Sequence, residues 1–350
     1  MNDHAKEHVT RELTRVRSEI NLELQRILAV VAQGPAARMY HMLSYFLGFL
    51  DENFQPQPDP VGKRFRSSLC LLIAEMYGAK KQALESAMAI ELFHNATLIH
   101  DDVEDRDEMR RGRPTLWKLY GVNHAINAGD AQLTIVAYST LLASQHSRVG
   151  FPLAHLLHST FAQVWEGQYL DFQMGNAVLS PELITEEHYL LTIKKKTGVL
   201  VGLAAEVAGV AAGLSNEECT RLREYGTAFG IAHQIANDYA SIWSSDMETG
   251  KDVGGDIREH KRTLPYIYAM AETDVHGRNR LEDLYSSQRQ LSNAEITEIR
   301  LIMDATGTRN YVHTQIREYS LQARAAVEKL SLGNRERKLL NDILDTLIVV

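Results

Sequence analysis

Apolar residues recur at spacings of three and four along nearly the whole chain of 350 residues. This period places them on one face of an α-helix, as in helices that pack around a common core. The segment 9–32 shows the pattern, with Leu13, Val16, Ile20 and Leu24 on one face. No stretch combines alternating apolar and polar residues with hairpin turns, which paired strands would need. The sequence therefore predicts an all-α protein.

Glycine, proline and polar residues separate the predicted helices. We expect helices at 9–32, at 35–50, ending at Tyr77, at 83–105, 123–145 and 151–174, from 181 into the Ala-rich stretch after Leu200, at 216–243, and in most of 266–347. No linker-like segment divides the chain, so residues 1–350 are expected to form one domain, a single large helical bundle. Residues 1–55 would supply N-terminal helices, 56–265 the chemical motifs and 266–350 the C-terminal helices.

Composition limits the possible partners and surroundings of the protein. A net charge of −8 gives no basic footprint for nucleic acid. Cys70 and Cys219 are far apart in sequence, which favours reduced thiols in a cytoplasmic protein. The most apolar stretch starts at Leu200 and carries Glu206, so it predicts a buried helix and no integral membrane segment.

Clustered charge follows the apolar helix that ends near residue 100. Asp101 and Asp105 lie one turn apart on one helical face, Asp102 is next to them, and Arg110 and Arg111 follow. Carboxylates suit Mg²⁺, which also binds substrate phosphates, and paired arginines bind phosphate oxygens. The alternative is a solvated helix end whose acids and arginines pair with each other. Acids in a run directly after an apolar helix favour the metal and phosphate site.

Two basic motifs point to anion binding. Lys63 and Arg66 share one face at a predicted helix start, where backbone N–H groups also favour anions. The second motif is the lysine run 194–196 with Thr197. Either motif could be a solvated basic surface. The lysines directly precede an apolar helix, however, and this predicts that Lys196 points inward.

A second oxygen-bearing stripe lies on the helix at 216–243. Gln234, either Asn237 or Asp238, and Ser241 fall on one face. This stripe is a candidate for further metal ligands, and its alternative is the solvent side of an ordinary helix.

The loop GKDVGGDIREHKRTLP follows that helix. Lys251, Lys261 and its glycines could close over phosphates. The alternative is a mobile surface loop with no ligand.

Together these motifs resemble those of the trans-isoprenyl diphosphate synthase (polyprenyl synthetase) family. The matching segments lie between Gly62 and Pro265 and are GKRFR, DDVEDRDEMRRGRPT, GQYLD, KTG, QIAND and GKDVGGD…KRTLP. The resemblance implies an all-α bundle of the isoprenoid synthase type with a central cavity. It also implies a homodimer, two to three Mg²⁺ ions, and two substrates, isopentenyl diphosphate and an allylic diphosphate.

The resemblance also assigns roles to residues. The allylic diphosphate and its Mg²⁺ would be held by Asp101, Asp105, Arg110, Lys196 and Lys251, with Asp102 nearby and Lys261 helping to close the site. The isopentenyl diphosphate would be bound by Lys63, Arg66, His94 and Arg111. Thr197 and Gln234 would border the reacting carbons, and Asp238 and Asn237 would belong to the second metal region. From the sequence alone, His94 could equally be a core histidine on an apolar helix.

The second metal region departs from the family pattern. Asn237 and Ser241 stand where the family commonly has Asp, so a third Mg²⁺ would bind weakly or depend on Asp238. This departure keeps two alternatives open: a class I terpene cyclase on the same scaffold, and a non-catalytic subunit of a heteromeric synthase. The isopentenyl diphosphate residues favour chain elongation over both.

Residues upstream of Asp101 would set the product length. One helical turn rises about 5.4 Å, roughly one isoprene unit. One turn up lie the small residues Ala96 and Thr97, and two turns up lies Phe93. These sizes predict a product of geranylgeranyl size or longer, with Phe93 as the floor. Simple core packing is the alternative role for Phe93.

Overall fold

The computed structural model describes residues 3–58, 60–146, 149–175, 181–244, 254–287 and 289–348. It divides into two compact units. The N-terminal unit comprises Asn2–Phe161 and Ala204–Cys219, and the C-terminal unit comprises Ala162–Leu203 and Thr220–Val350. The expectation of one folded domain stays a prediction.

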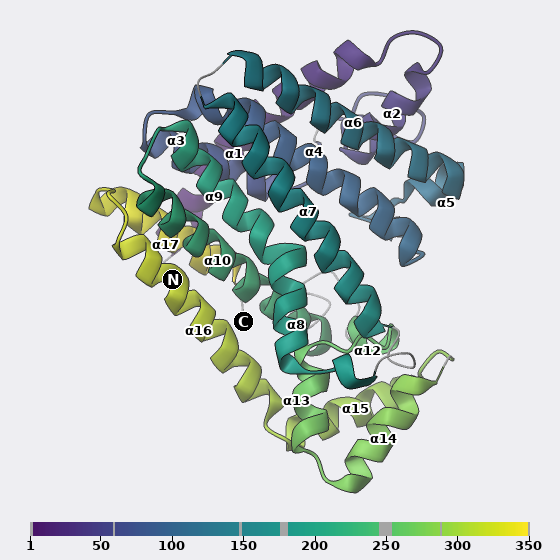
Figure 1. The fold of residues 1–350 in the computed structure, drawn as a ribbon. Coiled ribbons are helices and arrows are strands. Elements are labelled where there is room, and N and C mark those ends of the chain that lie inside the picture. The colour runs from purple at the N-terminus through teal and green to yellow at the C-terminus, as the bar shows by residue number, and fades with distance from the viewer. Residues whose placement is uncertain are drawn as a thin grey trace. The chain divides into compact units, whose positions relative to one another are not determined.

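The N-terminal unit is built from helices, labelled in Figure 1, and one short hairpin. Its elements are α1 (Asp3–Val31), α2 (Ala37–Phe46), α3 (Phe65–Met76), α4 (Lys80–Glu104), β1 (Met109–Arg110), β2 (Arg113–Pro114), α5 (Leu116–Tyr120), α6 (Val122–His146) and parts of α7 (Gly150–Gly175) and α9 (Val199–Ala211). Helix α4 packs against α3 and α6. Buried Gln132 of α6 donates a hydrogen bond to the carbonyl of Leu92 in α4. This helix pairing fixes the segment that ends in the clustered acids.

The described residues of the C-terminal unit form helices and connecting loops, with no strand among them. Besides the remaining parts of α7 and α9 it contains η1 (Pro181–Leu183), α8 (Glu186–Ile193), η2 (Lys194–Gly198), most of α10 (Asn216–Trp243), α12 (Gly255–Arg258), α13 (Leu264–Glu272), α14 (Val275–Ser286), α15 (Asn293–Ala305), α16 (Thr308–Glu328) and α17 (Asn334–Leu347). The element η2 is a π-helix, a wide turn that is often found at functional sites.

Small residues let α9 and α10 approach closely. A Cβ on Gly202 would lie 2.3 Å from Thr227 Oγ1, and one on Gly226 would lie 2.4 Å from the carbonyl oxygen of Val201. The buried helix predicted after Leu200 is therefore confirmed. No described helix has the length and apolar character needed to cross a membrane.

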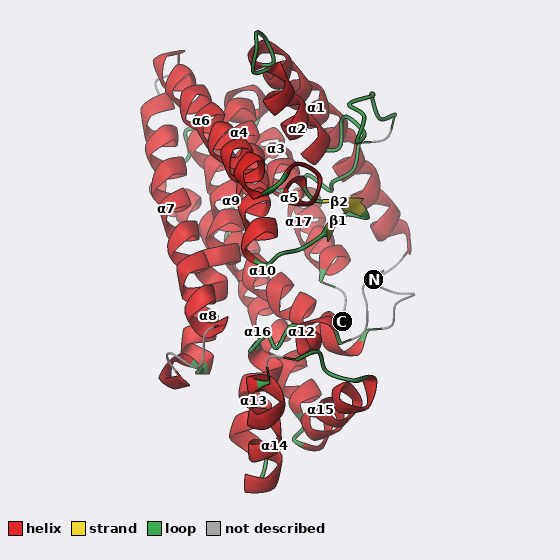
Figure 2. Ribbon diagram, turned by 90° about the vertical axis from the view of Figure 1, so that its right-hand side faces the viewer, coloured by secondary structure: helices red, strands yellow, loops and turns green. Residues whose placement is uncertain are grey.

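The all-α prediction is confirmed, with local differences. The helix predicted to reach residue 50 ends at Phe46, where Leu47 and Gly48 close it. No strand was expected, yet β1 and β2 pair antiparallel with Met109 opposite Pro114, drawn yellow in Figure 2. Their tight turn uses left-handed backbone at Arg111 and Gly112, with φ of 54° and 73°. A strand of two residues is too short to show an alternating apolar and polar pattern in the sequence.

Candidate functional site

Arg64 is held as a structural residue at the start of α3. It is the N-cap residue in left-handed conformation, and only 2 % of its surface is exposed. Its guanidinium donates to the carbonyl oxygen of Leu47 and, at 3.0 Å, to Asn21 Oδ1, and it lies 3.6 Å from Glu91 Oε1. Arg64 therefore fixes the start of the helix that carries the neighbouring basic residues.

Arg66 and His94 meet between α3 and α4. Arg66 Nη1 lies 3.0 Å from His94 Nε2. Burial lowers the pKa of Arg66 to about 10, so the guanidinium stays charged at neutral pH. Burial, and then the charges of Arg66 and Arg111, hold the pKa of His94 well below its ordinary value. His94 is thus neutral and accepts a hydrogen bond from Arg66. Lys63 is exposed just before this helix start.

Arg111 joins the same cluster from the hairpin turn. Its Nη1 and Nη2 each lie 3.4 Å from Asn95 Oδ1 on α4. Gly62 makes room for two guanidiniums, since a Cβ there would lie 2.9 Å from Arg64 Nη1 and 3.2 Å from Arg111 Nη1. Three of the four residues predicted for isopentenyl diphosphate, namely Arg66, His94 and Arg111, are therefore connected through α4.

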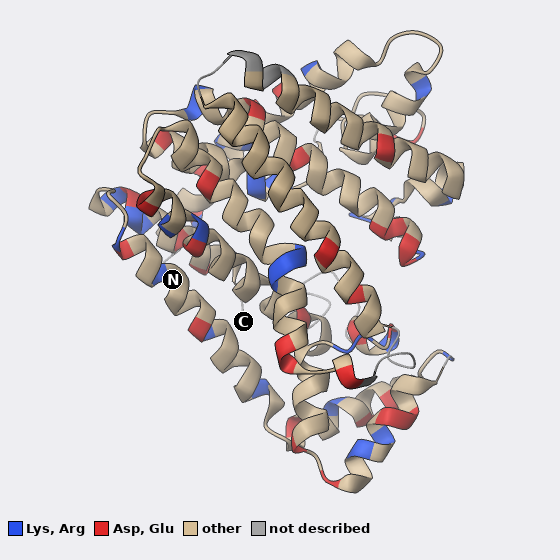
Figure 3. Cartoon of the chain, viewed as in Figure 1, with Lys and Arg blue, Asp and Glu red and all other residues tan. Residues whose placement is uncertain are grey.

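Acidic residues gather at the end of α4, drawn red in Figure 3. Their surroundings differ. Asp101 and Asp105 occupy successive turns, with the Asp105 N–H bonded to the Asp101 carbonyl at 2.8 Å, and Asp105 is exposed. Asp102 is buried, and its Oδ1 accepts a hydrogen bond from Arg110 Nε. Burial raises the pKa of Asp102 to about 6, against the opposing effect of Arg110. The expected alternative, in which the acids pair with the arginines, therefore holds for Asp102, which pairs with Arg110.

The lysine run adopts the π-helix η2 and packs on α7. A Cβ on Gly167 would lie 2.3 Å from the Lys196 backbone nitrogen, so glycine permits this approach. Lys196 Nζ lies 2.7 Å from Asp171 Oδ2. Thr197 is buried and donates to Gln234 Oε1 at 3.2 Å. Asp171 was not among the predicted site residues, although it is the last residue of GQYLD.

The stripe on α10 centres on Asp238. Its Oδ2 accepts from buried Tyr189 at 2.6 Å and its Oδ1 from Gln234 Nε2 at 2.9 Å. Burial, and then the nearby charge of Asp256, raise the pKa of Asp238 to about 7. Asn237 is exposed, so Asp238 is the member of the stripe that contacts Gln234.

Helix α12 adds Asp256 to this region. Ser241 Oγ donates to Asp256 Oδ2 at 2.5 Å, and Lys261 Nζ lies 4.0 Å from Asp256 Oδ1. Sequence reasoning passed over Asp256 and Tyr189. Asp256 is the last residue of the motif GKDVGGD, and this position could have marked it as a candidate site residue. Lys251 lies outside the described residues.

The donor groups fit a divalent cation. In the described residues no three His, Cys, Asp or Glu side chains converge as a ligand set. Mg²⁺, however, needs only one or two carboxylates when water and phosphate oxygens complete its shell. Asp101 with Asp105, and Asp238 with Asp256, provide such hard oxygen atoms. The raised pKa of Asp238 also reflects carboxylate repulsion, which a cation would relieve.

The predicted chain-length residues lie in the N-terminal unit. Phe93 is 1 % exposed, and its ring stacks on Phe161 of α7 with centroids 3.8 Å apart. Ala96 is buried, and Thr97 donates from Oγ1 to the His94 carbonyl at 2.8 Å. The two phenylalanines therefore form one aromatic pair.

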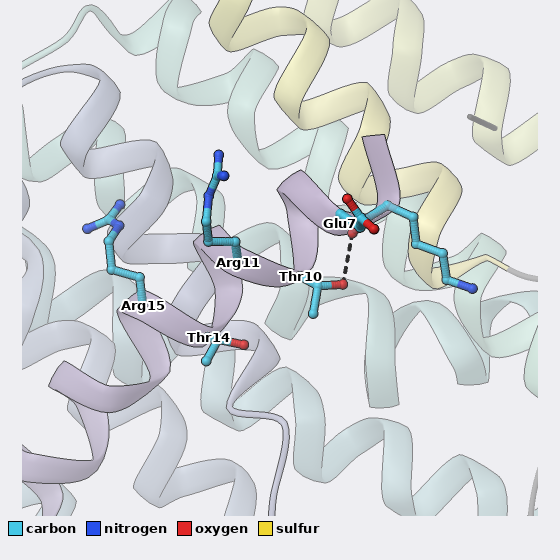
Figure 4. A pocket seen from close by; sticks show the side chains of 6 residues that line it. Glu7, Thr10, Arg11, Thr14 and Arg15 are labelled. Carbon is cyan, nitrogen blue, oxygen red and sulfur yellow. Dashed lines mark hydrogen bonds between the residues drawn. The ribbon is translucent and has the colours of Figure 1, made fainter. Parts of the chain in front are cut away.

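A separate hollow lies along α1 (Figure 4), with a volume of about 750 Å³. It contains none of the predicted site residues and carries both charge signs. Its lining residues are Lys6, Glu7, Thr10, Arg11, Thr14 and Arg15.

Guanidinium groups and carboxylates of these kinds can bind diphosphates and divalent cations. Comparison with known proteins identifies the family. A sequence model described as "Polyprenyl synthetase" matches residues 48–303, and the chain belongs to that family of prenyl diphosphate synthases.

Relatives cover nearly the whole chain. It is 33 % identical over 309 residues to a (2E,6E)-farnesyl diphosphate synthase of Mycobacterium tuberculosis, covering 87 % of this chain and 84 % of the relative. It is 34 % identical over 292 residues to a geranylgeranyl pyrophosphate synthase of Geoglobus acetivorans, covering 82 % and 86 %. A polyprenyl synthetase structure from Streptomyces coelicolor A3(2) matches with a TM-score of 0.87 and 26 % identity, over 97 % of this chain and all of that one.

Proposed function

We propose that this prenyl diphosphate synthase condenses isopentenyl diphosphate head-to-tail with an allylic diphosphate and releases a product of geranylgeranyl size or longer. The observation that carries the proposal is that the cations Arg66 and Arg111 are connected through α4, with neutral His94 bonded to Arg66. Together with Arg64 these residues form what we call the cation cluster. A cyclase needs no second diphosphate site. A non-catalytic subunit has no need to keep this cluster.

The reaction exchanges a C–O bond for a C–C bond. The allylic C–O bond breaks, the allylic carbon bonds to the isopentenyl double bond, and the departed pyrophosphate takes the proton that is lost. Two to three Mg²⁺ ions, held by Asp101, Asp105 and Asp238, would neutralise charge on the departing diphosphate. Arg110 and Lys196 bind the same group through charge-assisted hydrogen bonds. Lys251 and Lys261 would cover it.

The remaining groups orient the second substrate. Lys63, Arg66 and Arg111 bind the isopentenyl diphosphate, and neutral His94 keeps Arg66 directed. Thr197 and Gln234 hold each other beside the reacting carbons. Asn237, a neutral oxygen donor, contributes less to metal binding than Asp238. We also propose that the protein acts as a homodimer, which light scattering of the purified chain would test.

Incubation of the purified protein with Mg²⁺, labelled isopentenyl diphosphate and allylic primers tests the activity. Elongated prenyl diphosphates are expected, and chelation of the metal should abolish them. Hydrocarbon from geranylgeranyl diphosphate alone would instead indicate a cyclase. No turnover of any substrate would indicate a non-catalytic subunit.

The Phe93–Phe161 pair is proposed as the floor that limits product length. The small residues Ala96 and Thr97 lie on α4 between Phe93 and the acids, where they would leave room for a growing chain. Phe93→Ala and Phe161→Ala should each lengthen the product by at least one isoprene unit, measured by chromatography. Leu71→Ala, at a buried position in α3, controls for general loosening of the core. Unchanged products from both phenylalanine variants would contradict the floor.

A further inference from the structure

Glu91 is a buried carboxylate on α4 that has been given no chemical role above. Only 2 % of its surface is exposed. Its Oε2 accepts from Ser67 Oγ at 2.8 Å and its Oε1 accepts from Asn95 Nδ2 at 3.0 Å. Arg64 Nη1 lies 3.6 Å from the same Oε1. A carboxylate this deeply buried is retained only with such partners.

The contact with Glu91 determines which way the Asn95 amide faces. The Asn95 NH₂ group donates to Glu91 Oε1 at 3.0 Å and to the main-chain carbonyl of Glu91 at 2.8 Å. Both oxygens can only accept, so together they keep the NH₂ group directed toward Glu91. Its Oδ1 is then available to the guanidinium of Arg111, with both N–O distances at 3.4 Å. In the described part of the chain, the hydrogen bonds of Arg111 end on this oxygen. Arg64, by contrast, also has Leu47 and Asn21 as acceptors.

The charge of the cluster suits a diphosphate. Arg64, Arg66 and Arg111 contribute three positive charges, and Glu91 contributes one negative charge. His94 is neutral because its pKa is lowered by burial and by the neighbouring arginines. The cluster therefore keeps an excess of positive charge after Glu91 has been counted, which an anionic ligand can balance.

We propose that Glu91 is a positioning residue for the isopentenyl diphosphate site, acting through Asn95 to orient the guanidinium of Arg111. The inference rests on the proposed function, which assigns Arg111 to that substrate. Loss of the carboxylate has two opposing effects. It raises the positive potential, which favours an anion. It also removes one of the two oxygens that hold the Asn95 NH₂ group, so that the amide, and the Arg111 guanidinium on its Oδ1, are oriented less firmly by the remaining bond to the Glu91 main-chain carbonyl. Bidentate phosphate binding depends on guanidinium orientation, so the second effect dominates.

Glu91→Gln tests the proposal because it keeps the side-chain shape and removes the charge. The KM for isopentenyl diphosphate should rise about tenfold, while the KM for the allylic primer stays within about twofold. A lower KM for isopentenyl diphosphate would mean that Glu91 serves only as a countercharge. Unchanged KM values with a lower Tm would mean a purely structural role. Either result overturns the proposal.

A double-mutant cycle tests the route through Asn95. Asn95→Ala removes the acceptor for Arg111 and should raise the same KM as Glu91→Gln does. The double variant should be no worse than Asn95→Ala alone, whereas additive effects would exclude this route. Glu218→Gln is the matched control, since Glu218 is also buried and accepts a hydrogen bond from Tyr77 at 2.9 Å. It should leave both KM values unchanged. Absence of turnover by the wild-type protein would count against the proposed function and not against this relay.

Discussion

The cation cluster of the N-terminal unit and the acid pair of the C-terminal unit solve the problem of buried charge differently. The arginines have a built-in countercharge, because Glu91 lies among them and orients Asn95. Asp238 instead receives hydrogen bonds from the neutral groups of Tyr189 and Gln234, and Asp256 raises its pKa further. The first region is organised before any ligand binds. The second has an electrostatic cost that a bound cation would remove.

The same contrast occurs within the aspartates of α4. Asp102 is buried and paired with Arg110, whereas Asp105 is exposed at the helix end. Asp102 thus resembles the arginine cluster in having a residue of opposite charge beside it. Asp101 and Asp105 are the proposed cation ligands.

The largest expected effect comes from removing a cation ligand of α4. Asp101→Asn and Asp105→Asn should each lower kcat by about 10²–10³-fold, because charge on the departing diphosphate is then less well neutralised. Steady-state kinetics at saturating substrates would measure this loss. The exposed acid Glu104 provides the control, and Glu104→Gln should retain activity with an unchanged Tm. Equal losses in all three variants would contradict the distinction between ligand acids and surface acids.

Arg64 and Arg111 are expected to have different roles in the cation cluster. Arg64 would mainly stabilise the fold, and Arg111 would mainly bind substrate. Arg64→Ala leaves the buried carboxylate of Glu91 without its ion pair and should cost about 3–5 kcal/mol of unfolding free energy. Arg111→Ala should cost only about 1 kcal/mol, because Arg111 contacts the neutral Asn95 amide at 3.4 Å and balances no buried acid, and should mainly raise the KM for isopentenyl diphosphate. Urea denaturation measures the first effect and kinetics the second. Similar stability losses in both variants would show that the two arginines have one common role.

The acid pair makes stability depend on pH. An ordinary Asp has a pKa of about 3.9, but burial and Asp256 raise the pKa of Asp238 to about 7 in the folded chain. Between about pH 4 and pH 7, Asp238 is therefore protonated in the folded state and ionised in the unfolded state. The stability from this proton is complete below about pH 4 and is lost as the pH rises to about 7.

Asp238→Asn cannot ionise and should escape this loss. In metal-free protein, the stability of the variant relative to wild type should increase by roughly 2–3 kcal/mol between pH 4.5 and pH 7.5. Chemical denaturation at both pH values measures the difference. A difference that does not change with pH would mean that Asp238 is ionised throughout.

Much of the fold followed from the sequence, because it depends on local order. Apolar periods predicted the long helices, and the ordered motifs predicted the family that the sequence model confirms. The roles of the single site residues stay predictions. A stripe with spacings of three and four could not choose between Asn237 and Asp238, since both fit it. In the structure Asp238 is buried and Asn237 is exposed, and which of them binds a metal stays a prediction. Glu91 was overlooked because its role depends on Asn95 and on arginines distant in sequence.

The π-helix η2 was also beyond sequence reasoning, because it depends on a contact with α7. The N-terminal arginines are oriented by carboxylate and amide groups, whereas the Lys196 backbone is placed by its close approach to Gly167. Gly167→Ala would put a Cβ 2.3 Å from the Lys196 backbone nitrogen, and a backbone atom cannot rotate away. We expect a loss of about 1–2 kcal/mol in stability together with a lower kcat, since η2 carries Lys196 and Thr197.

Gly175→Ala is the matched control on the same helix, because a Cβ there has nothing within 4 Å. Helix propensity alone would make both substitutions neutral or stabilising by about 0.5–1 kcal/mol. Opposite signs for the two variants in thermal unfolding, with kcat lowered only by Gly167→Ala, would show that backbone packing fixes the lysine turn. Equal signs would mean that η2 tolerates displacement, and Lys196 would then depend on side-chain contacts, as the arginines do.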